Sequence, residues 1–443
     1  MFRRVEQTLP SSLARPVRWR PTTPAQATPQ MTCSATLPGM KLHGLLCALA
    51  LVLAPATAGA VDWALVGARV YPAADSAPVD DAVVLLHDHT IAAVGKRDAG
   101  SVPAGARVID CRGKTVVAGF WNSHVHFMEP GFSAASPAPK LQEQLRAMLS
   151  RWGVTTAFDL GSPPASSLAL RERIEHGELD GPRLLLAADV FPAGPSPSYL
   201  PADLALPKAG TAAEAAQLAR AGMARVGDGL KLFTGVFLGA GKPVHNMPVE
   251  VARAAAAVAR AAGKPVFAHP QNHAGVACAL AAGVDVLAHT IPDQGRFSLD
   301  ELSRARLQHT ALIPTLALWR IVTRGAPPAV VEAMVKGGIE ELGQWHRNGG
   351  TILFGTDVGF HDQYDTTQEL ADMGRALPWR AILASLTTSP ATFFHGPERG
   401  RVAPGLRADL VVLDADPALD PRNLAKVAYT IRDGRIIYQR QGL

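Results

Sequence analysis

Two histidines separated by one residue stand out in the stretch from Gly119 to Phe127, which reads GFWNSHVHF. Imidazole nitrogens are good ligands for zinc and similar ions, whereas an imidazole buried without a partner is costly. On a β-strand, residues i and i+2 point to the same face. If this apolar run is a strand, His124 and His126 face the same side and could bind one metal ion.

Four further polar residues end or interrupt later apolar runs. They are Lys231 in GLKLFT, His269 in PVFAH, His289 in VDVLAHT and Asp357 in TILFGTD. Each of them alone is more often an ordinary hydrogen-bonded core residue, so their common placement carries the prediction. Together with the histidine pair they would form a site of nitrogen and oxygen ligands, which suits zinc or a related divalent ion.

Eight apolar runs are predicted to be the strands that position these residues. They cover residues 122–127, 155–160, 183–190, 229–234, 265–269, 284–290, 311–318 and 351–357. Their continuous apolar character is typical of parallel strands buried on both faces. Ala-rich segments between them, such as 211–226 and 248–262, are predicted helices. The alternation predicts an α/β fold, a (β/α)₈ TIM barrel over residues 119–400, with the polar residues at its carboxyl end, where barrel enzymes keep their active sites.

The two flanking segments have a different pattern of apolar and polar residues. Residues 61–118 and 401–443 contain short alternating runs bounded by turn residues, and Asp433-Gly434 is a hairpin turn signal. We expect the two segments to pair into one small β-sandwich domain. His87 and His89 share the spacing of the first histidine pair, but they lie in the hairpin LHDHTI and are expected in a surface turn.

Residues 1–60 are predicted to be a leader, with a signal peptide over residues 40–60. Lys41 precedes an apolar run from Leu45 to Leu53, and Ala58 to Ala60 match a cleavage pattern. The run is shorter than the ~20 residues that span a bilayer. The mature protein is therefore expected to be periplasmic or secreted, with no membrane anchor.

The mature chain would be close to electrically neutral. Without the leader, 37 basic and 37 acidic residues remain, so nucleic acid binding is not expected. Only Cys111 and Cys278 remain of the cysteines, too few for a disulfide framework. The fold must be held together by its core.

The whole pattern resembles the metal-dependent amidohydrolase superfamily, in its imidazolonepropionase-like and prolidase-like branch. The resemblance covers nearly all of residues 63–443: the β-domain built from both ends, the histidine pair, and the motifs GLKLFTG, FAHPQN, LAHT, FGTDVG and LTTSPATFF…GRVAPGLRADLVVLDADP. Family members commonly have Pro and Asp where this chain has Ala118 and Asn122. Neither position is a ligand position.

The resemblance implies a site with two divalent metal ions, expected to be Zn²⁺. His124, His126 and Asp357 would bind one ion, His269 and His289 the other. A free ammonium cannot bind a cation. In the family the corresponding lysine is carboxylated by CO₂, so Lys231 would bridge the two ions as a carbamate. The alternative is a free Lys231 that binds substrate, or pairs with Asp357, over a single-metal site.

The implied activity is hydrolysis of a C–N amide bond of a small substrate, an N-acyl amino acid or a dipeptide, by a metal-activated hydroxide. Asp357 fits the general base, which takes a proton from the attacking hydroxide and returns it to the leaving amine. Arg320 and Tyr364, which follow the last two predicted strands, could hold a substrate carboxylate, and His273 lies at the same end of the barrel.

Two other functions stay open. One is hydrolysis of a cyclic amide or lactone, which needs no grip on a carboxylate. The other is a non-catalytic binding protein on the same scaffold. The expected partner is a small-molecule substrate, and a homo-oligomer would be ordinary for this fold.

Overall fold

The computed structural model describes residues 62–98, 101–201 and 203–442. The predicted leader and signal peptide lie outside this part of the chain. Within it, no helix combines the length and the apolar character needed to cross a membrane.

Seven parallel strands form most of a barrel, in the order in which they occur along the chain. They are β6 (Phe120–Val125), β7 (Val154–Asp159), β8 (Arg183–Pro192), β10 (Gly229–Phe233), β13 (Val266–His269), β14 (Val286–Ala288) and β15 (Ala311–Ile313). All neighbouring pairs are parallel. The predicted TIM-barrel fold is confirmed.

The eighth predicted strand, over residues 351–357, was wrong as a regular strand. This segment forms only an isolated bridge, from Ile352 to β15, and the next residue, Val358, forms another to β6. It still closes the barrel, since Leu353 N–H donates to the Leu312 carbonyl at 3.0 Å and Asp357 N–H to the His124 carbonyl at 2.8 Å. Asp357 has a φ of +62°, which ends the extended conformation before a regular strand can form.

The seventh strand is shorter than predicted. It stops at Ile313 instead of continuing to Leu318, and helix α7 (Leu316–Val322) follows at once. Thr315 adopts the left-handed conformation, with φ +44° and ψ 53°, and turns the chain into this helix. Arg320 and its neighbour Trp319 therefore lie on α7 and not in a loop.

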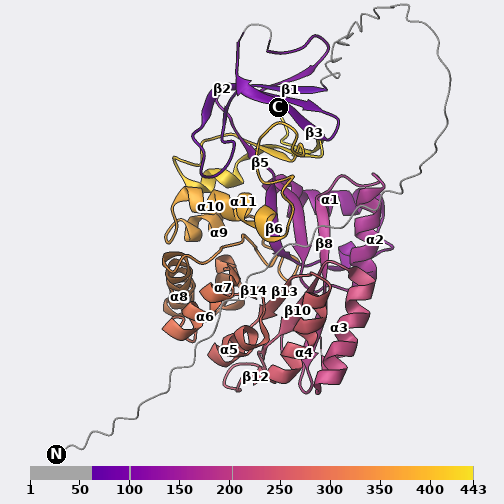
Figure 1. Ribbon diagram of the computed structural model, residues 1–443, viewed down its shortest axis with the longest axis vertical. Helices are drawn as coiled ribbons and strands as arrows, with labels where there is room; N and C mark the ends of the chain where they lie inside the picture. The colour runs from indigo at the N-terminus through magenta and orange to yellow at the C-terminus, as the bar shows by residue number, and fades with distance from the viewer. Residues whose placement is uncertain (1–61, 99–100, 202, 443) are drawn as a thin grey trace, which may run out of the picture. The chain divides into compact units, whose positions relative to one another are not determined.

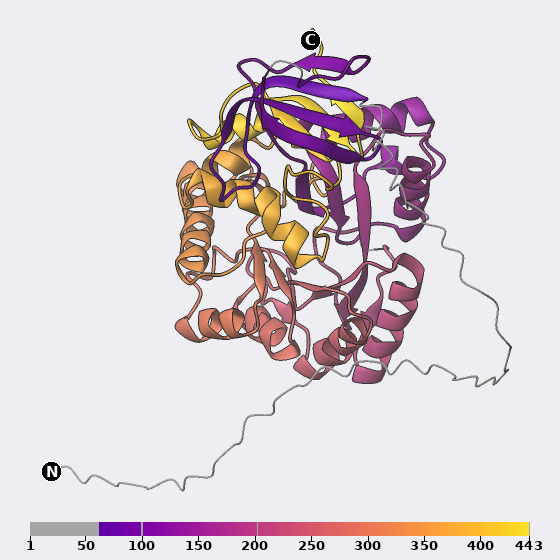
Figure 2. The same ribbon diagram turned by 45° about the horizontal axis from the view of Figure 1, so that its top comes forward.

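Helices lie around the outside of the strands in both ribbon views (Figures 1 and 2). They are α1 (Ala138–Met148), α2 (Pro164–Glu175), α3 (Ala212–Val226), α4 (Val249–Ala261), α5 (His273–Ala282), α6 (Leu299–Leu307), α7, α8 (Pro328–Arg347), α9 (Thr367–Met373), α10 (Trp379–Leu386) and α11 (Thr388–Phe393). The two Ala-rich helices match their predicted spans to within one residue. Thr211 caps α3 in a capping box with Glu214.

Short elements complete the described part of the chain. The strands β9 (Lys208–Ala209), β11 (Gly235–Val236) and β12 (His245–Asn246) lie in the loops after β8 and β10. Single 3₁₀ turns occur at Pro130–Phe132, Ser150–Trp152 and Pro421–Ala425.

The two ends of the chain build a separate β-domain, as predicted. One sheet runs in the order β18-β17-β16-β5-β1-β2-β3, with β4 paired to β1. The strands are β1 (Trp63–Val70), β2 (Val79–His87), β3 (Thr90–Lys96), β4 (Arg107–Asp110), β5 (Thr115–Ala118), β16 (Leu410–Leu413), β17 (Val427–Arg432) and β18 (Arg435–Gln439). The antiparallel pairing of β5 with β16 joins the two ends, whose indigo and yellow ribbons lie side by side in Figures 1 and 2.

The sheet of the β-domain folds back on itself. Ile91 N–H on β3 donates to the Leu406 carbonyl at 2.9 Å, and Ala408 N–H donates to the His89 carbonyl at 2.8 Å. A second core, which includes Leu65, Val84 and Leu410, fills this domain. His87 and His89 lie at its surface hairpin, and the His87 side chain is 38% exposed.

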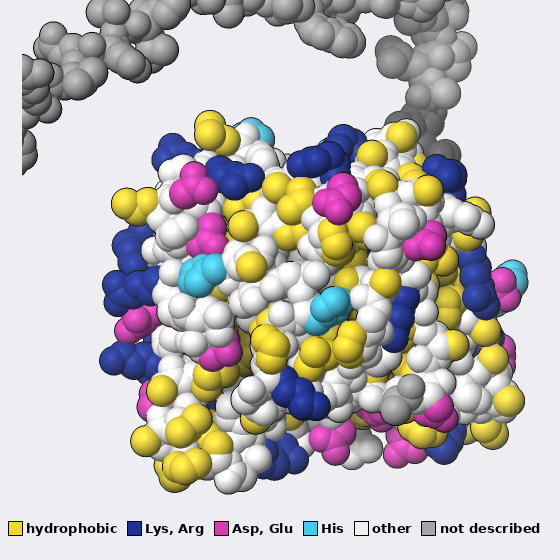
Figure 3. Space-filling model, turned by 90° about the horizontal axis from the view of Figure 1, so that it is seen from below, with side chains coloured by type: hydrophobic (Ala, Val, Ile, Leu, Met, Phe, Trp, Pro, Cys, Tyr) yellow, Lys and Arg dark blue, Asp and Glu magenta, His cyan; other side chains and the backbone are white. Residues whose placement is uncertain are grey.

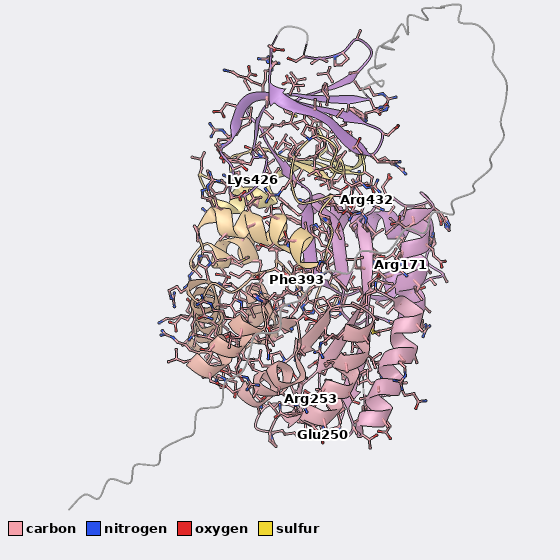
Figure 4. All side chains as sticks on the ribbon, in the orientation of Figure 1. Arg171, Glu250, Arg253, Phe393, Lys426 and Arg432 are labelled. Atoms are coloured by element: carbon pink, nitrogen blue, oxygen red, sulfur yellow. The ribbon has the colours of Figure 1, made fainter. Side chains whose placement is uncertain are left out.

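Contacts between the β-domain and the barrel are made at the amino ends of the barrel strands. Arg183, the first residue of β8, forms ion pairs with Asp409 at 3.2 Å and with Asp433 at 2.8 Å. Arg432, labelled in Figure 4, donates to the Gly181 carbonyl at 3.1 Å, just before β8. The carboxyl ends of the strands are therefore left for a functional site.

Candidate metal centre

Three predicted ligands meet at one point between β6 and the eighth segment. The Nε2 atoms of His124 and His126 lie 3.2 Å apart. Asp357 Oδ1 lies 3.1 Å from the first of these nitrogens and 2.8 Å from the second. All three residues are buried.

The geometry of this group fits a divalent cation. Among the described residues, Asp357 Oδ1 has no partner in hydrogen-bond geometry, although two imidazole nitrogens lie within about 3 Å of it. Ligands bound at about 2.0–2.2 Å to one ion lie about 3 Å or slightly more from each other. His124, His126 and Asp357 can therefore hold a metal ion.

The other three predicted ligands lie beside this group. His289 directly follows β14; its ring stacks on that of His124, with centroids 4.8 Å apart, and its Nε2 lies 3.6 Å from Asp357 Oδ2. The His269 ring, at the end of β13, meets the His289 ring edge-on at 5.2 Å. Lys231 on β10 is buried, with Nζ 3.5 Å from the Ala288 carbonyl. The structure thus brings all six residues together at the carboxyl end of the barrel.

Hydrogen bonds on the outer ring nitrogens determine how these histidines present their lone pairs. His126 Nδ1 lies 3.0 Å from the Gly161 carbonyl, and His269 Nε2 lies 3.0 Å from Gln271 Oε1. Because these oxygens only accept, each nitrogen must carry the proton. The opposite nitrogen of each ring then keeps a lone pair for a metal ion.

In His289, contact with Thr315 likewise places the proton on Nδ1 and leaves the lone pair on Nε2. The Thr315 hydroxyl donates to the Pro314 carbonyl at 2.9 Å, so it can only accept from His289 Nδ1, with which it forms a short contact. Thr315 is itself held by Glu369, whose carboxylate accepts the N–H groups of Leu316 at 2.9 Å and Ala317 at 2.6 Å. A carboxylate 80 residues further along the chain thus helps to orient His289 through Thr315.

Strained backbone accompanies these contacts. Three residues here have a positive φ: Gln271 (+56°), Thr315 (+44°) and Asp357 (+62°). The first two follow barrel strands, and the third ends the eighth segment. Positive φ in a non-glycine residue costs about 1–3 kcal/mol and persists only where the surroundings impose it. Three of the eight non-glycine residues with positive φ in the described part of the chain therefore lie at or beside the candidate ligands.

Charges in the group favour a bound cation. Burial alone would raise the pKa of Asp357, but the imidazoles of His124 and His289 hold it well below its usual range. Burial lowers the pKa of His124 to about 3 and that of His269 to about 4, so both rings are neutral. Burial also lowers the pKa of Lys231 to about 8, against the opposing pull of the Asp357 carboxylate.

The other predicted site residues do not join this group. Arg320 donates to both carboxylate oxygens of Asp372, at 2.8 and 2.9 Å. The Tyr364 hydroxyl donates to Glu129. His273 begins α5, and its two ring nitrogens contact Glu301 at 2.9 Å and the Gln294 carbonyl at 3.1 Å.

Two residues near the site were not singled out from the sequence. Asp189 lies on β8 as the register partner of Lys231. Tyr199, in the loop after β8, is 36% exposed, and its ring lies 6.4 Å from that of His269 and 5.4 Å from that of Phe360. A charge inside an apolar strand was a usable signal for Asp189. No sequence signal pointed to Tyr199, whose position depends on contacts between loops.

The side of the molecule away from the β-domain is shown in Figure 3. Histidine side chains reach the surface there among hydrophobic and uncharged side chains, and most Lys and Arg side chains lie toward the edge of the view. This mixed surface has no dominant charge.

Solved structures with the same fold include several prolidases. A candidate prolidase from Bifidobacterium longum is 26% identical, with a TM-score of 0.73 over 86% of this chain and 95% of that one. A Xaa-Pro dipeptidase with methionine bound in its active site is 20% identical, with a TM-score of 0.72 over 85% of this chain and all of that one. A prolidase in complex with N-methylphosphonate-L-proline is 24% identical, with a TM-score of 0.72 over 85% of this chain and all of that one.

A family comparison agrees with the site. The sequence model described as the amidohydrolase family matches residues 115–437, which is well over half of the chain and spans all six converging residues. The resemblance seen in the sequence is confirmed. The chain belongs to the amidohydrolase family, as a metal-dependent hydrolase that acts on carbon–nitrogen bonds.

Proposed function

We propose that this protein hydrolyses the amide bond of a dipeptide or an N-acyl amino acid, using two divalent metal ions, most simply zinc. The convergence of His124, His126 and Asp357 on one point is the observation that carries the proposal. We also propose a periplasmic or secreted location, which the predicted signal peptide supports.

The division of the ligands between the two ions is the one that the resemblance to the family implies. His124, His126 and Asp357 would hold one ion, while His269 and His289 would hold the second. Lys231 would lie between the ions as a carbamate: its nitrogen bonds to the carbon of CO₂ and loses a proton. Only the neutral amine can react in this way, and burial, which lowers the pKa of Lys231 to about 8, increases the share of that form at neutral pH.

Asp357 is the candidate for proton transfer. Ions bound at the site would lower the pKa of a water molecule and polarise the substrate carbonyl. The Asp357 carboxylate is ionised, so the oxygen that does not bind the ion can accept a proton from the attacking water. Returning that proton to the leaving nitrogen completes the cleavage of the amide into an acid and an amine.

Support for a peptide-like substrate comes from the relatives. The 26% identical structure is described as a candidate prolidase, and a more distant prolidase binds a proline phosphonate. Arg320 and Tyr364 remain proposals for holding a substrate carboxylate, and His273 for another substrate contact. Each already has a carboxylate partner in the protein. Because these side chains are already paired, they would have to leave their partners to hold a substrate carboxylate. A cyclic amide or lactone needs no such contact and is therefore the second candidate substrate.

The first test is hydrolysis of a substrate panel by the purified protein with zinc supplied. The panel contains dipeptides, N-acyl amino acids, lactams and lactones, with Asp357→Asn as the blank. We expect cleavage of substrates that have a free carboxylate. Cleavage of lactams or lactones alone would move the assignment to ring opening, and no cleavage by the fully metallated protein would favour a binding protein.

Thr315→Val should weaken metal binding. The substitution keeps the shape of the side chain and removes the acceptor for His289 Nδ1. Loss of such an outer contact typically lowers metal affinity about 10- to 100-fold. Zinc content measured at a series of buffered free-zinc concentrations checks this expectation.

The matched control for this substitution is Thr310→Val. Thr310 is also buried and donates to a backbone carbonyl, that of Val284 at 3.2 Å, but it does not contact a candidate ligand. Its zinc affinity should equal that of the wild type. An unchanged affinity in Thr315→Val would mean that Thr315 does not orient His289.

A further inference from the structure

Asp189 points into the barrel beside the candidate metal ligands. It is the register partner of Lys231 in the parallel pairing of β8 with β10, and register partners face the same side of a sheet. Ala187, two residues earlier on the same face, belongs to the cluster inside the barrel. The residue as a whole is of intermediate exposure, and it lies near the carboxyl end of its strand.

The Asp189 carboxylate has no partner within the described part of the chain. Oδ1 is buried without a hydrogen bond, and no Lys, Arg or His nitrogen lies within ion-pair distance. The nearby Asp159 is different, since it accepts from the hydroxyls of Ser162 and Ser167, both at 2.6 Å. A carboxylate left in this state is costly unless a cation or donor reaches it.

Space for such a group is provided by Gly161. A Cβ on this residue would lie 2.9 Å from Asp189 Oδ1, so a larger residue would press against the carboxylate. Burial, with a smaller contribution from the Asp159 carboxylate, raises the pKa of Asp189 to about 7, against a weaker opposing effect of His126 and Lys231, neither of which forms an ion pair with it. A bound cation would reverse that shift.

Lys231 does not fill this role. Its ammonium is directed to the Ala288 carbonyl at 3.5 Å, and in the proposed function it becomes an anionic carbamate. The six candidate ligands are already assigned to the metal ions, so we look for the partner of Asp189 in the substrate. In a dipeptide the α-ammonium is attached to the carbon next to the scissile carbonyl, so a group that binds it must lie beside the metal ligands, where Asp189 lies.

We propose that Asp189 binds the α-ammonium group of the substrate and makes the enzyme selective for dipeptides with a free amino terminus over N-acyl amino acids. This inference rests on the proposed function and names the substrate class of the same site. The charge of Asp189 acts in recognition, while Asp357 carries the proton.

The test uses substrate pairs that differ only in the ammonium group. Alanyl and N-propionyl derivatives of proline, methionine and phenylalanine are compared, and kcat/KM is measured for the leaving amino acid that the wild type releases fastest. We expect the wild type to prefer the alanyl compound at least tenfold. In Asp189→Asn, kcat/KM for that compound should fall about 10- to 100-fold, as expected for losing a charge-assisted hydrogen bond, with little change for the N-propionyl compound.

Controls separate recognition from support of the metal site. Asp189→Ala should behave like Asp189→Asn, and both should keep the wild-type zinc content. Asp362→Asn removes an exposed carboxylate from the segment that follows Asp357 and should keep the wild-type preference.

Each other outcome overturns the inference. Equal losses on both substrates, or a loss of zinc, would show that Asp189 supports Lys231 and not the substrate. A wild type that cleaves the N-propionyl compound equally well would contradict the inference and leave the proposed function standing. A zinc-loaded wild type that cleaves neither compound would contradict the proposed function as well.

Discussion

Replacing Asp357 by Asn is expected to lower kcat about 10²- to 10⁴-fold, the range for losing a general base, while most of the metal stays bound. The amide has nearly the same shape as the carboxylate but cannot accept the proton of the attacking water. His124 and His126, whose Nε2 atoms lie 3.2 Å apart, still offer two nitrogen ligands. The measurement is kcat on the best panel substrate, together with zinc content per chain.

The matched control for Asp357→Asn is Asp362→Asn, which removes a charge five residues later at an exposed position. It should retain wild-type kcat and zinc content. Turnover by Asp357→Asn within tenfold of the wild type would exclude Asp357 as the base. Complete loss of zinc would instead assign the residue mainly to metal binding.

Replacing Lys231 by Arg is expected to lower both the zinc content and kcat. A guanidinium stays protonated at neutral pH, so it cannot react with CO₂, and it leaves a positive charge among the candidate ligands. The site should lose at least one ion per chain. Activity should fall at least about 10³-fold, because a bound ion supplies several kcal/mol of transition-state stabilisation and each 1.36 kcal/mol is tenfold in rate.

The same substitution tests the alternative role of Lys231. If its ammonium binds the substrate or pairs with Asp357 over a single ion, an arginine should preserve part of the activity and all of the zinc. Lys242→Arg, at an exposed lysine after β11, is the matched control and should change neither quantity.

Dependence on CO₂ gives a second readout for Lys231. Metal-free wild type should regain full activity with zinc only when bicarbonate is present. Equal recovery in its absence, with CO₂ excluded from the buffers, would contradict the carbamate.

Local patterns in the sequence were sufficient to predict the barrel and the residues that converge at its end. Apolar runs and the i, i+2 spacing of His124 and His126 are properties of short segments, and parallel strands in a barrel present their carboxyl ends together. The pairing of the two chain ends was also predictable, because alternating hairpins on either side of a barrel have few other ways to bury their apolar faces.

Long-range contacts decided the remaining features. The left-handed turn at Thr315 shortened the seventh strand because Glu369, far along the chain, accepts the first N–H groups of α7. The irregular eighth segment, which ends at the positive φ of Asp357, is also tied to β6 by Asn122, whose side chain donates to the Thr356 hydroxyl at 2.7 Å. No local pattern contains either contact.

The state of each polar side chain was likewise decided by the tertiary structure. Residue type and spacing showed that Arg320 could hold an anion, but the fold places Asp372 against it. Asp189 looked like part of a buried strand, but the fold leaves its carboxylate without a partner beside Lys231. The sequence by itself determined the strands and the identity of the ligand atoms, because these depend on neighbours along the chain. Which charges are satisfied and which are free to meet a substrate depends on neighbours in space, and only the folded structure decided it.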